Sequence, residues 1–326
     1  MRAAATVVAL LALAPAPARS WLASGHREVA EAAVRSLPSG VPAFLRDAPG
    51  EVARLAAVPD LGRGDATPAL RDRESPEHYI DLERLAGRPW PELRSRYLAE
   101  LAARGLGVGA AGTLPWAVRE QTERLALALA LHRRDPADGG ARALALVSAG
   151  ALAHYAADLE QPLHTTIHHD GWALPDGRPP FDGTHLKVDA LIDRARFDHE
   201  GAAAGAGARN LADLDGAIRA ELAASHALLD RTYALVPALA TPAGYARPEV
   251  AAFACERYEA AVRFVASLLL TAWERSAAVE LPSWSAAGAA AAVGRRAQAE
   301  KELPQPQLPV ARGLWNLKPA PFMPKT

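Results

Sequence analysis

Cysteine is nearly absent from this chain of 326 residues, which contains only Cys255. A single cysteine excludes a disulfide within the chain, so packing or a bound metal has to hold the fold together. An excess of charge of one sign is also lacking, because 36 Lys and Arg residues are balanced by 37 Asp and Glu residues. This balance excludes a protein that coats duplex nucleic acid by bulk charge, although a local basic patch is compatible with it.

Long hydrophobic runs are scarce, and the one near the start of the chain is short. A basic residue precedes the apolar stretch 7–14, and small residues follow it up to Ser20. This pattern predicts a signal peptide over residues 1–20, with a soluble Ala-rich helix as the alternative. The apolar stretch is too short to span a membrane, so we expect no transmembrane segment in the mature chain. Cleavage after Ser20 would leave Trp21 as the N-terminus of a secreted or periplasmic protein.

The alternation of polar and β-branched residues that is typical of strands is scarce as well, whereas Ala and Leu recur with the period of a helix. This periodicity predicts helices over residues 26–37, 91–104, 115–132, 141–160, 182–197, 211–236 and 248–276. We therefore expect an all-α fold, with a single mainly helical domain over residues 21–280. Residues 201–208 are expected to form a flexible joint. Residues 281–326 are Ala- and Pro-rich, and we expect a poorly ordered tail there.

The most informative stretch of the sequence runs from His154 to His164. His154 and Asp158 are four residues apart, so on a helix they share one face. An imidazole and a carboxylate on one face are suited to binding zinc. Pro162 would end the helix and allow His164 to approach the same place. A buried hydrogen bond between the His and the Asp is the alternative interpretation.

A second pair repeats the same spacing further along the chain. His185 and Asp189 are again four residues apart, with Lys187 between them as a solvated side chain. Two helices of this kind that face each other could hold two metal ions within bridging distance.

Two upstream segments offer further ligands. Asp60 and His78 lie in segments that are expected to be irregular, from which side chains can reach over a helical site. At the N-terminus of the mature chain, the α-amino group of Trp21 has an ordinary pKa of about 7.7–8.0 and can bind metal once it is deprotonated. His26 follows close to that terminus.

In chain order, these segments resemble the superfamily that joins the bacterial zinc phospholipases C to the single-strand-preferring nucleases of the mung bean type. The pattern of that superfamily is an N-terminal Trp, a nearby His, an Asp, a His followed by an aromatic residue, His-x3-Asp-x5-His, and a final His-x3-Asp or His-x3-Glu. Residues 21–276 fill each of these positions in order. A single match of this kind is weak, but the ordered set is specific.

The resemblance implies a mainly helical fold with a site for three zinc ions. By position, the ligands of the first ion would be Asp60, His78, His154 and Asp158, and those of the second His164, His185 and Asp189. The third ion would be held by the amino nitrogen and carbonyl oxygen of Trp21, by His26 and by the other oxygen of Asp158. Because such ligands come from several helices, metal binding would hold these helices together and stabilise the fold.

The resemblance also implies that the protein is an enzyme that hydrolyses phosphodiesters. Zinc lowers the pKa of a bound water from 15.7 to about 7, so a hydroxide that bridges two of the ions would be the nucleophile. Asp60 would orient or deprotonate that water, and Arg63 would place positive charge where negative charge accumulates. An exposed side chain without a catalytic role is the alternative interpretation of Arg63.

Two short matches favour the nuclease branch over the phospholipase branch. One is the spacing between the N-terminal Trp and its His, and the other is the Asp-x-x-Arg motif that ends at Arg63. Tyr79 and Asp81 then match an aromatic ring that stacks on a base and an acid that binds the edge of the base. Stacking contributes roughly 1–3 kcal/mol per base. Packing in the core is the alternative interpretation of Tyr79.

Other features depart from both branches. Val188 stands where the nucleases carry a Trp, their disulfides are missing, and residues 172–180 replace their approach to the last His. The acid that binds choline in the phospholipases has no counterpart in residues 22–24.

The sequence therefore predicts an endonuclease for single-stranded DNA or RNA, with a phospholipase C that acts on phospholipid as the alternative. A non-catalytic zinc-binding protein is a third reading, disfavoured because structural zinc sites are usually rich in Cys. No obligate protein partner is evident.

Overall fold

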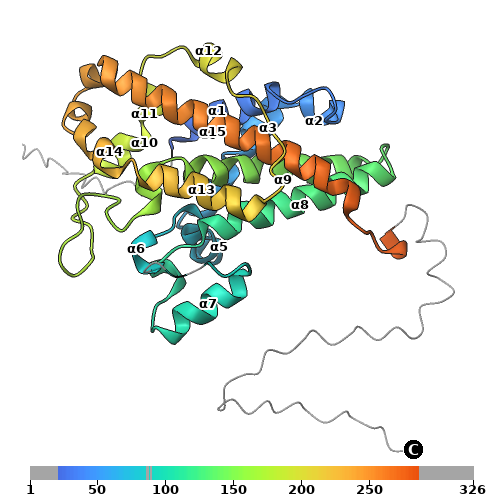
Figure 1. The fold of residues 1–326 in the computed structure, drawn as a ribbon, viewed down its shortest axis with the longest axis horizontal. Coiled ribbons are helices and arrows are strands. Elements are labelled where there is room, and N and C mark those ends of the chain that lie inside the picture. Colours follow the sequence, from blue (N-terminus) through green and yellow to red (C-terminus); the bar gives the residue numbers. More distant parts are fainter. Residues whose placement is uncertain (1–20, 86–87, 89, 286–326) are drawn as a thin grey trace, which may run out of the picture. The chain divides into compact units, whose positions relative to one another are not determined.

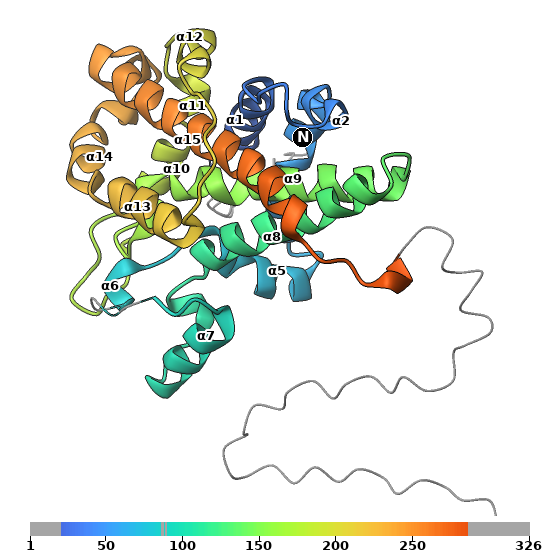
Figure 2. The ribbon, with the colours of Figure 1, turned by 45° about the vertical axis from the view of Figure 1, so that its right-hand side comes forward.

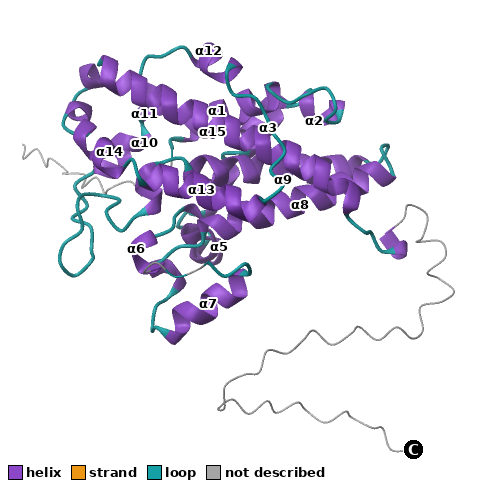
Figure 3. Ribbon diagram, viewed as in Figure 1, coloured by secondary structure: helices purple, strands orange, loops and turns teal. Residues whose placement is uncertain are grey.

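The structure is a computed structural model that describes residues 21–85, 88 and 90–285. It is 69% helical and contains no strand within the described residues, which confirms the all-α fold (Figures 1 and 3). The α-helices are α1 (Ala23–Arg35), α2 (Ala43–Arg46), α3 (Pro49–Leu55), α4 (Val58–Gly62), α5 (Pro68–Glu74), α6 (Leu82–Leu85), α7 (Arg94–Ala103), α8 (Leu114–Arg134), α9 (Gly139–Leu159), α10 (Thr184–Asp189), α11 (Leu191–Arg194), α12 (His199–Ala204), α13 (Leu214–His226), α14 (Leu229–Leu235) and α15 (Pro248–Arg275). Short 3₁₀ turns connect them, among them η1 (Ser75–His78), η2 (Val108–Ala110) and η3 (Pro162–Thr165).

The helices α8, α9 and α15 form the centre of the fold. α8 and α9 lie side by side along most of their length, and α15 lies across them and against α1 (Figure 2). α15 contributes Phe253, Val262 and Leu269 to a continuous buried core. Of these helices α9 is the most apolar on all sides, and almost every residue of its second half is buried. Polar side chains on that half of α9 are therefore held in a rigid and dry environment.

The ends of α8 and α9 follow from local sequence signals. Pro115 lies in the first turn of α8, where its missing N–H is not needed, and α8 ends just before Asp135. The side chain of Asp138 caps α9 by accepting a hydrogen bond from the backbone N of Gly140 at 2.8 Å. After α9 ends, the side chain of Gln161 accepts from the backbone N of Leu163 at 2.6 Å and starts η3.

Two of the expected long helices are broken in the structure. The helix expected over residues 182–197 consists of α10 and α11, which are separated at Ala190, and the backbone is extended from Ala195. The helix expected over residues 211–236 consists of α13 and α14, with a break at residues 227–228. Neither break contains a Gly or Pro, so helical periodicity alone could not locate it.

The prediction of a flexible joint over residues 201–208 is wrong for the first half of that range. Residues up to Ala204 belong to α12, because the side chain of Asp198 caps this helix by accepting from the backbone N of Gly201 at 3.0 Å. A capped first turn that packs against α15 outweighs the low helix propensity of Gly201.

The contacts divide the chain into two units, Met1–Leu281 and Pro282–Thr326. The second unit contains the 3₁₀ turn Ser283–Ser285, and the rest of the expected tail lies outside the described residues. The expected signal peptide, residues 1–20, lies outside them as well. In the part of the chain that the structure describes, no helix is both long and apolar enough to cross a membrane.

Candidate metal centre

The second half of α9 carries the residues at the centre of the site. One face of this helix packs closely on the end of α3 at Gly150, where an added Cβ would lie 2.8 Å from the carbonyl carbon of Leu55. This close approach brings the carbonyl oxygen of Ala56 to 2.7 Å from Nδ1 of His154, one turn further along α9. A carbonyl can only accept, so Nδ1 is the donor and Nε2 is left with a free lone pair that points away from α3.

The side chains that the sequence analysis selected as metal ligands come together in three groups. In each group, one potential ligand atom per residue lies within 4.8 Å of the others. The groups are His26, His154 and Asp158; Asp60, His78 and His154; and His164, His185 and Asp189. Each could hold a metal ion. The third group has the same members as the set implied for the second ion, and the second group contains three of the four residues implied for the first ion. The first group joins His26 and Asp158, implied for the third ion, with His154.

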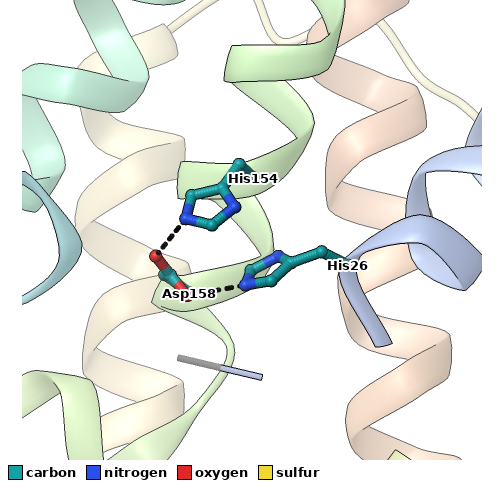
Figure 4. A group of neighbouring side chains, drawn as sticks. All are labelled: His26, His154 and Asp158. Atoms are coloured by element: carbon teal, nitrogen blue, oxygen red, sulfur yellow. Dashed lines mark ion pairs between the residues drawn. The ribbon is translucent and has the colours of Figure 1, made fainter. Parts of the chain in front are cut away.

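Asp158 joins these groups (Figure 4). Its Oδ1 lies 3.3 Å from Nε2 of His26 on α1, and its Oδ2 lies 3.4 Å from Nε2 of His154. The two imidazole rings are stacked, with their centroids 3.9 Å apart. Oδ1 of Asp158 also lies 3.4 Å from Nδ1 of His164 in η3. One carboxylate therefore faces imidazoles from three separate segments of the chain.

The group around Asp189 is formed by α10 and η3. Nε2 of His185 lies 3.3 Å from Oδ2 of Asp189 and 3.1 Å from Nε2 of His164. The other carboxylate oxygen of Asp189 accepts a hydrogen bond from the side-chain amide of Gln161 at 2.7 Å. Gln161 therefore fixes the orientation of the Asp189 carboxylate. The other oxygen of that carboxylate, Oδ2, faces His185.

Four of the contacts around Asp158 and Asp189 have the spacing expected between ligands of a metal such as zinc. Ligands placed 2.0–2.2 Å from a tetrahedral zinc ion lie roughly 3.3–3.6 Å from one another, and most of the contacts above fall in that range. Several buried ligand atoms also have no hydrogen-bond partner among the described residues. They include Nε2 of His78, Nε2 of His154 and Oδ2 of Asp189. Buried polar atoms normally have partners, and a cation shared between them would supply one.

The electrostatics favour neutral imidazoles at this centre. Burial lowers the pKa of His26 and of His154 to about 4, and that of His185 to about 3. Burial likewise lowers the pKa of His78 and of His164 well below the ordinary value. Neutral imidazole is the form that binds metal, so near neutral pH the rings require no proton release.

Asp60 lies within the short helix α4, which corrects the irregular segment expected there, and Arg63 follows the last residue of that helix. Oδ1 of Asp60 is 3.7 Å from Nε2 of His78, whose Nδ1 donates to the carbonyl oxygen of Glu74 at 2.7 Å. Arg63, one turn after Asp60, places Nη1 3.2 Å from the same carboxylate oxygen. The structure thus brings the predicted acid and the predicted arginine to the edge of the metal centre.

Trp21 lies beside this centre. Its side chain is completely buried, and the indole nitrogen donates to the carbonyl oxygen of Ala157 at 2.8 Å, next to Asp158. The backbone nitrogen of Leu22 donates to the carbonyl oxygen of Asp189 at 3.4 Å. The start of the described chain therefore contacts α9 and α10, two of the helices that carry candidate ligands.

A cavity of about 320 Å³ opens next to the centre. Both residues predicted to bind substrate, Tyr79 and Asp81, line it, together with His78 and His185. The half-buried Tyr79 donates from its hydroxyl to the carbonyl oxygen of Gly109 at 2.6 Å. Burial raises the pKa of Asp81 to about 7. Tyr79 and Asp81 thus share one cavity with the candidate metal ligands His78 and His185.

Several residues that support the site were not identified from the sequence. Besides Gln161, they include Asp170, whose carboxylate accepts from the backbone N of His185 at 3.0 Å, and Asp193, which accepts from the hydroxyl of Ser24. Gln161 lies inside the His-x3-Asp-x5-His motif, so its position in the motif was a usable signal. The two aspartates follow no motif, and only the fold places them here.

Comparison of the chain with family models, curated proteins and solved structures finds no match.

Proposed function

We propose that this protein is a zinc-dependent phosphodiesterase with three zinc ions, and that it acts on single-stranded nucleic acid as an endonuclease. The observation that carries the proposal is the convergence of buried His and Asp atoms from α1, α4, η1, α9, η3 and α10 on one centre. Structural zinc sites are usually closed and rich in Cys. Here the ligands are His and Asp, and a cavity lies beside them.

The metal, when bound, would supply a water whose pKa lies near 7 and positive charge for the phosphate. The residues of the chain have supporting tasks. Asp60, which is largely buried and lies beside His78, would orient the attacking water and accept its proton. Arg63 would hold a fixed positive charge next to the phosphate. Tyr79 would stack on a base, with Asp81 at the edge of that base.

Phospholipase C activity is the second candidate, and one observation favours it. The segment between η3 and α10 lines the cavity through Gly177 and Pro179, and it exposes large apolar side chains nearby in the sequence. Trp172 is 50% exposed and Phe181 is 71% exposed. Exposed apolar groups of this kind suit contact with a lipid surface.

The proposal is tested with purified protein that begins at Trp21. Its zinc content is measured first, and hydrolysis of bis(p-nitrophenyl) phosphate is then assayed before and after treatment with a chelator. We expect zinc-dependent hydrolysis that returns when zinc is added back. Bound zinc without hydrolysis would favour a non-catalytic zinc-binding protein, and protein without bound metal would contradict the proposal.

The same preparation separates the two substrate classes. Single-stranded DNA and RNA are compared with phosphatidylcholine vesicles at equal enzyme concentration. Faster cleavage of nucleic acid is expected, and hydrolysis of the lipid alone would establish the phospholipase instead.

We further propose that the protein is exported to the periplasm or the medium and loses residues 1–20 on the way. The burial of Trp21 beside Ala157 and Asp158 supports this, because a new amino group at Trp21 would arise next to the metal centre. Mass spectrometry of the N-terminal peptide of exported protein tests the proposal. A peptide that still begins at Met1 would contradict it and would remove the third zinc site.

A further inference from the structure

Arg84 lines the same cavity as the metal ligands His78 and His185. It belongs to the short helix α6, and its backbone nitrogen donates to the carbonyl oxygen of Asp81 at 2.9 Å. The guanidinium lies against the turn at Gly177, where an added Cβ would lie 3.0 Å from Nη2 of Arg84. Gly177 has a φ of +81°, so glycine is favoured at this turn for its backbone conformation as well as for its size. The turn therefore holds the guanidinium at the wall of the cavity.

The side chain of Arg84 has little to neutralise it. Its Nε is buried and has no hydrogen-bond partner within the described ranges. The neighbouring Glu83 is engaged elsewhere, because its carboxylate accepts from the hydroxyl of Thr166 and from the backbone N of Ile167 at 3.1 Å. Asp81 is the acid in the cavity lining, and no ion pair joins it to Arg84 among the described residues. Burial raises the pKa of Asp81, and the charge of Arg84 opposes that shift.

The other arginines of the cavity are bonded to acids. Arg178 is exposed and binds Asp176, with Nη2 2.7 Å and Nε 2.8 Å from one carboxylate oxygen. Arg63 lies 3.2 Å from Asp60, at the metal centre itself. Arg84 is thus a further cation of the cavity besides Arg63 and Arg178, and it lies on a different segment from both. A partly buried guanidinium of this kind is most stable when an anion accepts its hydrogen bonds.

We propose that Arg84 binds a second anionic group of the substrate, so that the diester which is hydrolysed carries another phosphate close to the scissile one. This inference rests on the proposed phosphodiesterase function and narrows its substrate class. A nucleotide chain supplies such a phosphate on the neighbouring nucleotide. A choline headgroup would instead bring a cation towards the guanidinium and be repelled by it.

The inference is tested by comparing two ligands that differ by one phosphate. The binding of thymidine 5′-phosphate and of thymidine 3′,5′-bisphosphate to the zinc-loaded protein is measured by calorimetry at neutral pH. Charge-assisted hydrogen bonds of this kind correspond to about a 10- to 100-fold gain in affinity. We expect the wild-type protein to prefer the bisphosphate by a factor in this range.

Variants of Arg84 identify the source of that preference. We expect Arg84→Gln to bind the two ligands with nearly equal affinity, and Arg84→Lys, which keeps the charge but not the planar fork, to keep part of the preference. Arg96→Gln is the matched control, since Arg96 is exposed on α7 away from the cavity lining, and it should keep the full preference. Circular dichroism checks that each variant is folded.

Two results would overturn the inference. One is equal affinity of the wild-type protein for both ligands, which requires no variant. The other is a preference that survives in folded Arg84→Gln. The proposed function is judged separately, by hydrolysis of bis(p-nitrophenyl) phosphate. If the protein prefers the bisphosphate but hydrolyses no diester, the anion site at Arg84 is supported and the proposed phosphodiesterase function is contradicted.

Discussion

His154 donates a hydrogen bond from Nδ1 to the carbonyl oxygen of Ala56, 2.7 Å away, across the contact between α9 and the end of α3. This bond fixes the tautomer of the imidazole and directs Nε2 toward Asp158, which lies 3.4 Å from it. Loss of a partner that orients a ligand in this way typically lowers metal affinity about 10- to 100-fold. The candidate metal centre therefore depends on α3, a helix that contributes no ligand of its own.

Gly150→Ala tests that dependence, because the added methyl group would meet the backbone of Leu55 and push α3 away from α9. We expect the free energy of unfolding to fall by about 1–3 kcal/mol and zinc affinity to fall with it. Urea unfolding and zinc titration measure the two effects. Gly139→Ala is the control, since no atom lies within 4 Å of its added Cβ. Equal stability of the two variants would show that the close approach is unimportant.

Asp158→Asn removes the charge and one accepting oxygen from the carboxylate that faces His26, His154 and His164. We expect hydrolysis of bis(p-nitrophenyl) phosphate to fall by more than about 100-fold, together with a loss of bound zinc and a lower melting temperature. Asp138→Asn is the matched control on the same helix, because Asn caps helices as well as Asp does. Wild-type activity in Asp158→Asn would contradict the assignment of the metal ligands.

Arg63→Ala separates a role in catalysis from a role in folding. Arg63 touches Asp60 but offers no metal-binding atom of its own near neutral pH. We expect the variant to keep its zinc and to lose turnover by about 10²-fold, with a smaller loss in Arg63→Lys. Zinc analysis and steady-state kinetics on the same samples give both quantities. If zinc were lost as well, Arg63 would instead be needed to hold Asp60 in place.

Tyr79 offers a test of base stacking. We expect Tyr79→Ala to raise KM for a dinucleotide, because stacking on an aromatic ring contributes about 1–3 kcal/mol per base, and to affect bis(p-nitrophenyl) phosphate little. Tyr79→Phe keeps the ring and loses only the hydrogen bond to Gly109, so its KM should remain close to that of the wild type. Equal effects of Tyr79→Ala on both substrates would exclude stacking.

Asp81 makes the stability of the protein depend on pH. Burial raises its pKa from 3.8 to about 7 in the folded chain, so the folded state holds the proton more tightly than the unfolded state. Below about pH 4 both states hold the proton, and its contribution to the free energy of unfolding is fully present. This contribution decreases as the pH rises and is lost once the pH has passed through 7. Between pH 5 and 8 the loss should be about 2–3 kcal/mol.

Asp81→Asn, which is neutral at each pH, should remove that loss. Urea unfolding at pH 5 and pH 8, with a chelator present to exclude metal effects, compares the variant with the wild type. An equal change with pH in both proteins would show that Asp81 does not titrate in this range.

The parts of the site that follow helical spacing could be predicted from the sequence. His154 with Asp158, and His185 with Asp189, lie one turn apart in α9 and α10, so their side chains share a face once a helix forms. The contact between the two pairs could be inferred only through the resemblance. It depends on how η3 turns His164 toward both of them. Pro162 indicates that the helix ends there, but not the direction that the chain takes afterwards.

The support around the ligands could not be predicted. The carbonyl oxygen of Ala56 is a backbone atom, and no sequence pattern marks it as the partner of His154. Asp193, which contacts Ser24, lies on α11, beyond the break at Ala190 that helical periodicity did not predict. Arg84 follows no motif, and its place in the cavity depends on the turn at Gly177, far away in the sequence.

Because one carboxylate, Asp158, faces imidazoles on α1, α9 and η3, the three groups cannot fill independently. The first ion to bind would change the charge that Asp158 presents to the remaining rings, so its binding is coupled to that of the next ion. Zinc loading should therefore depart from independent filling, so that a titration followed by native mass spectrometry shows partly loaded species in proportions that independent sites would not give.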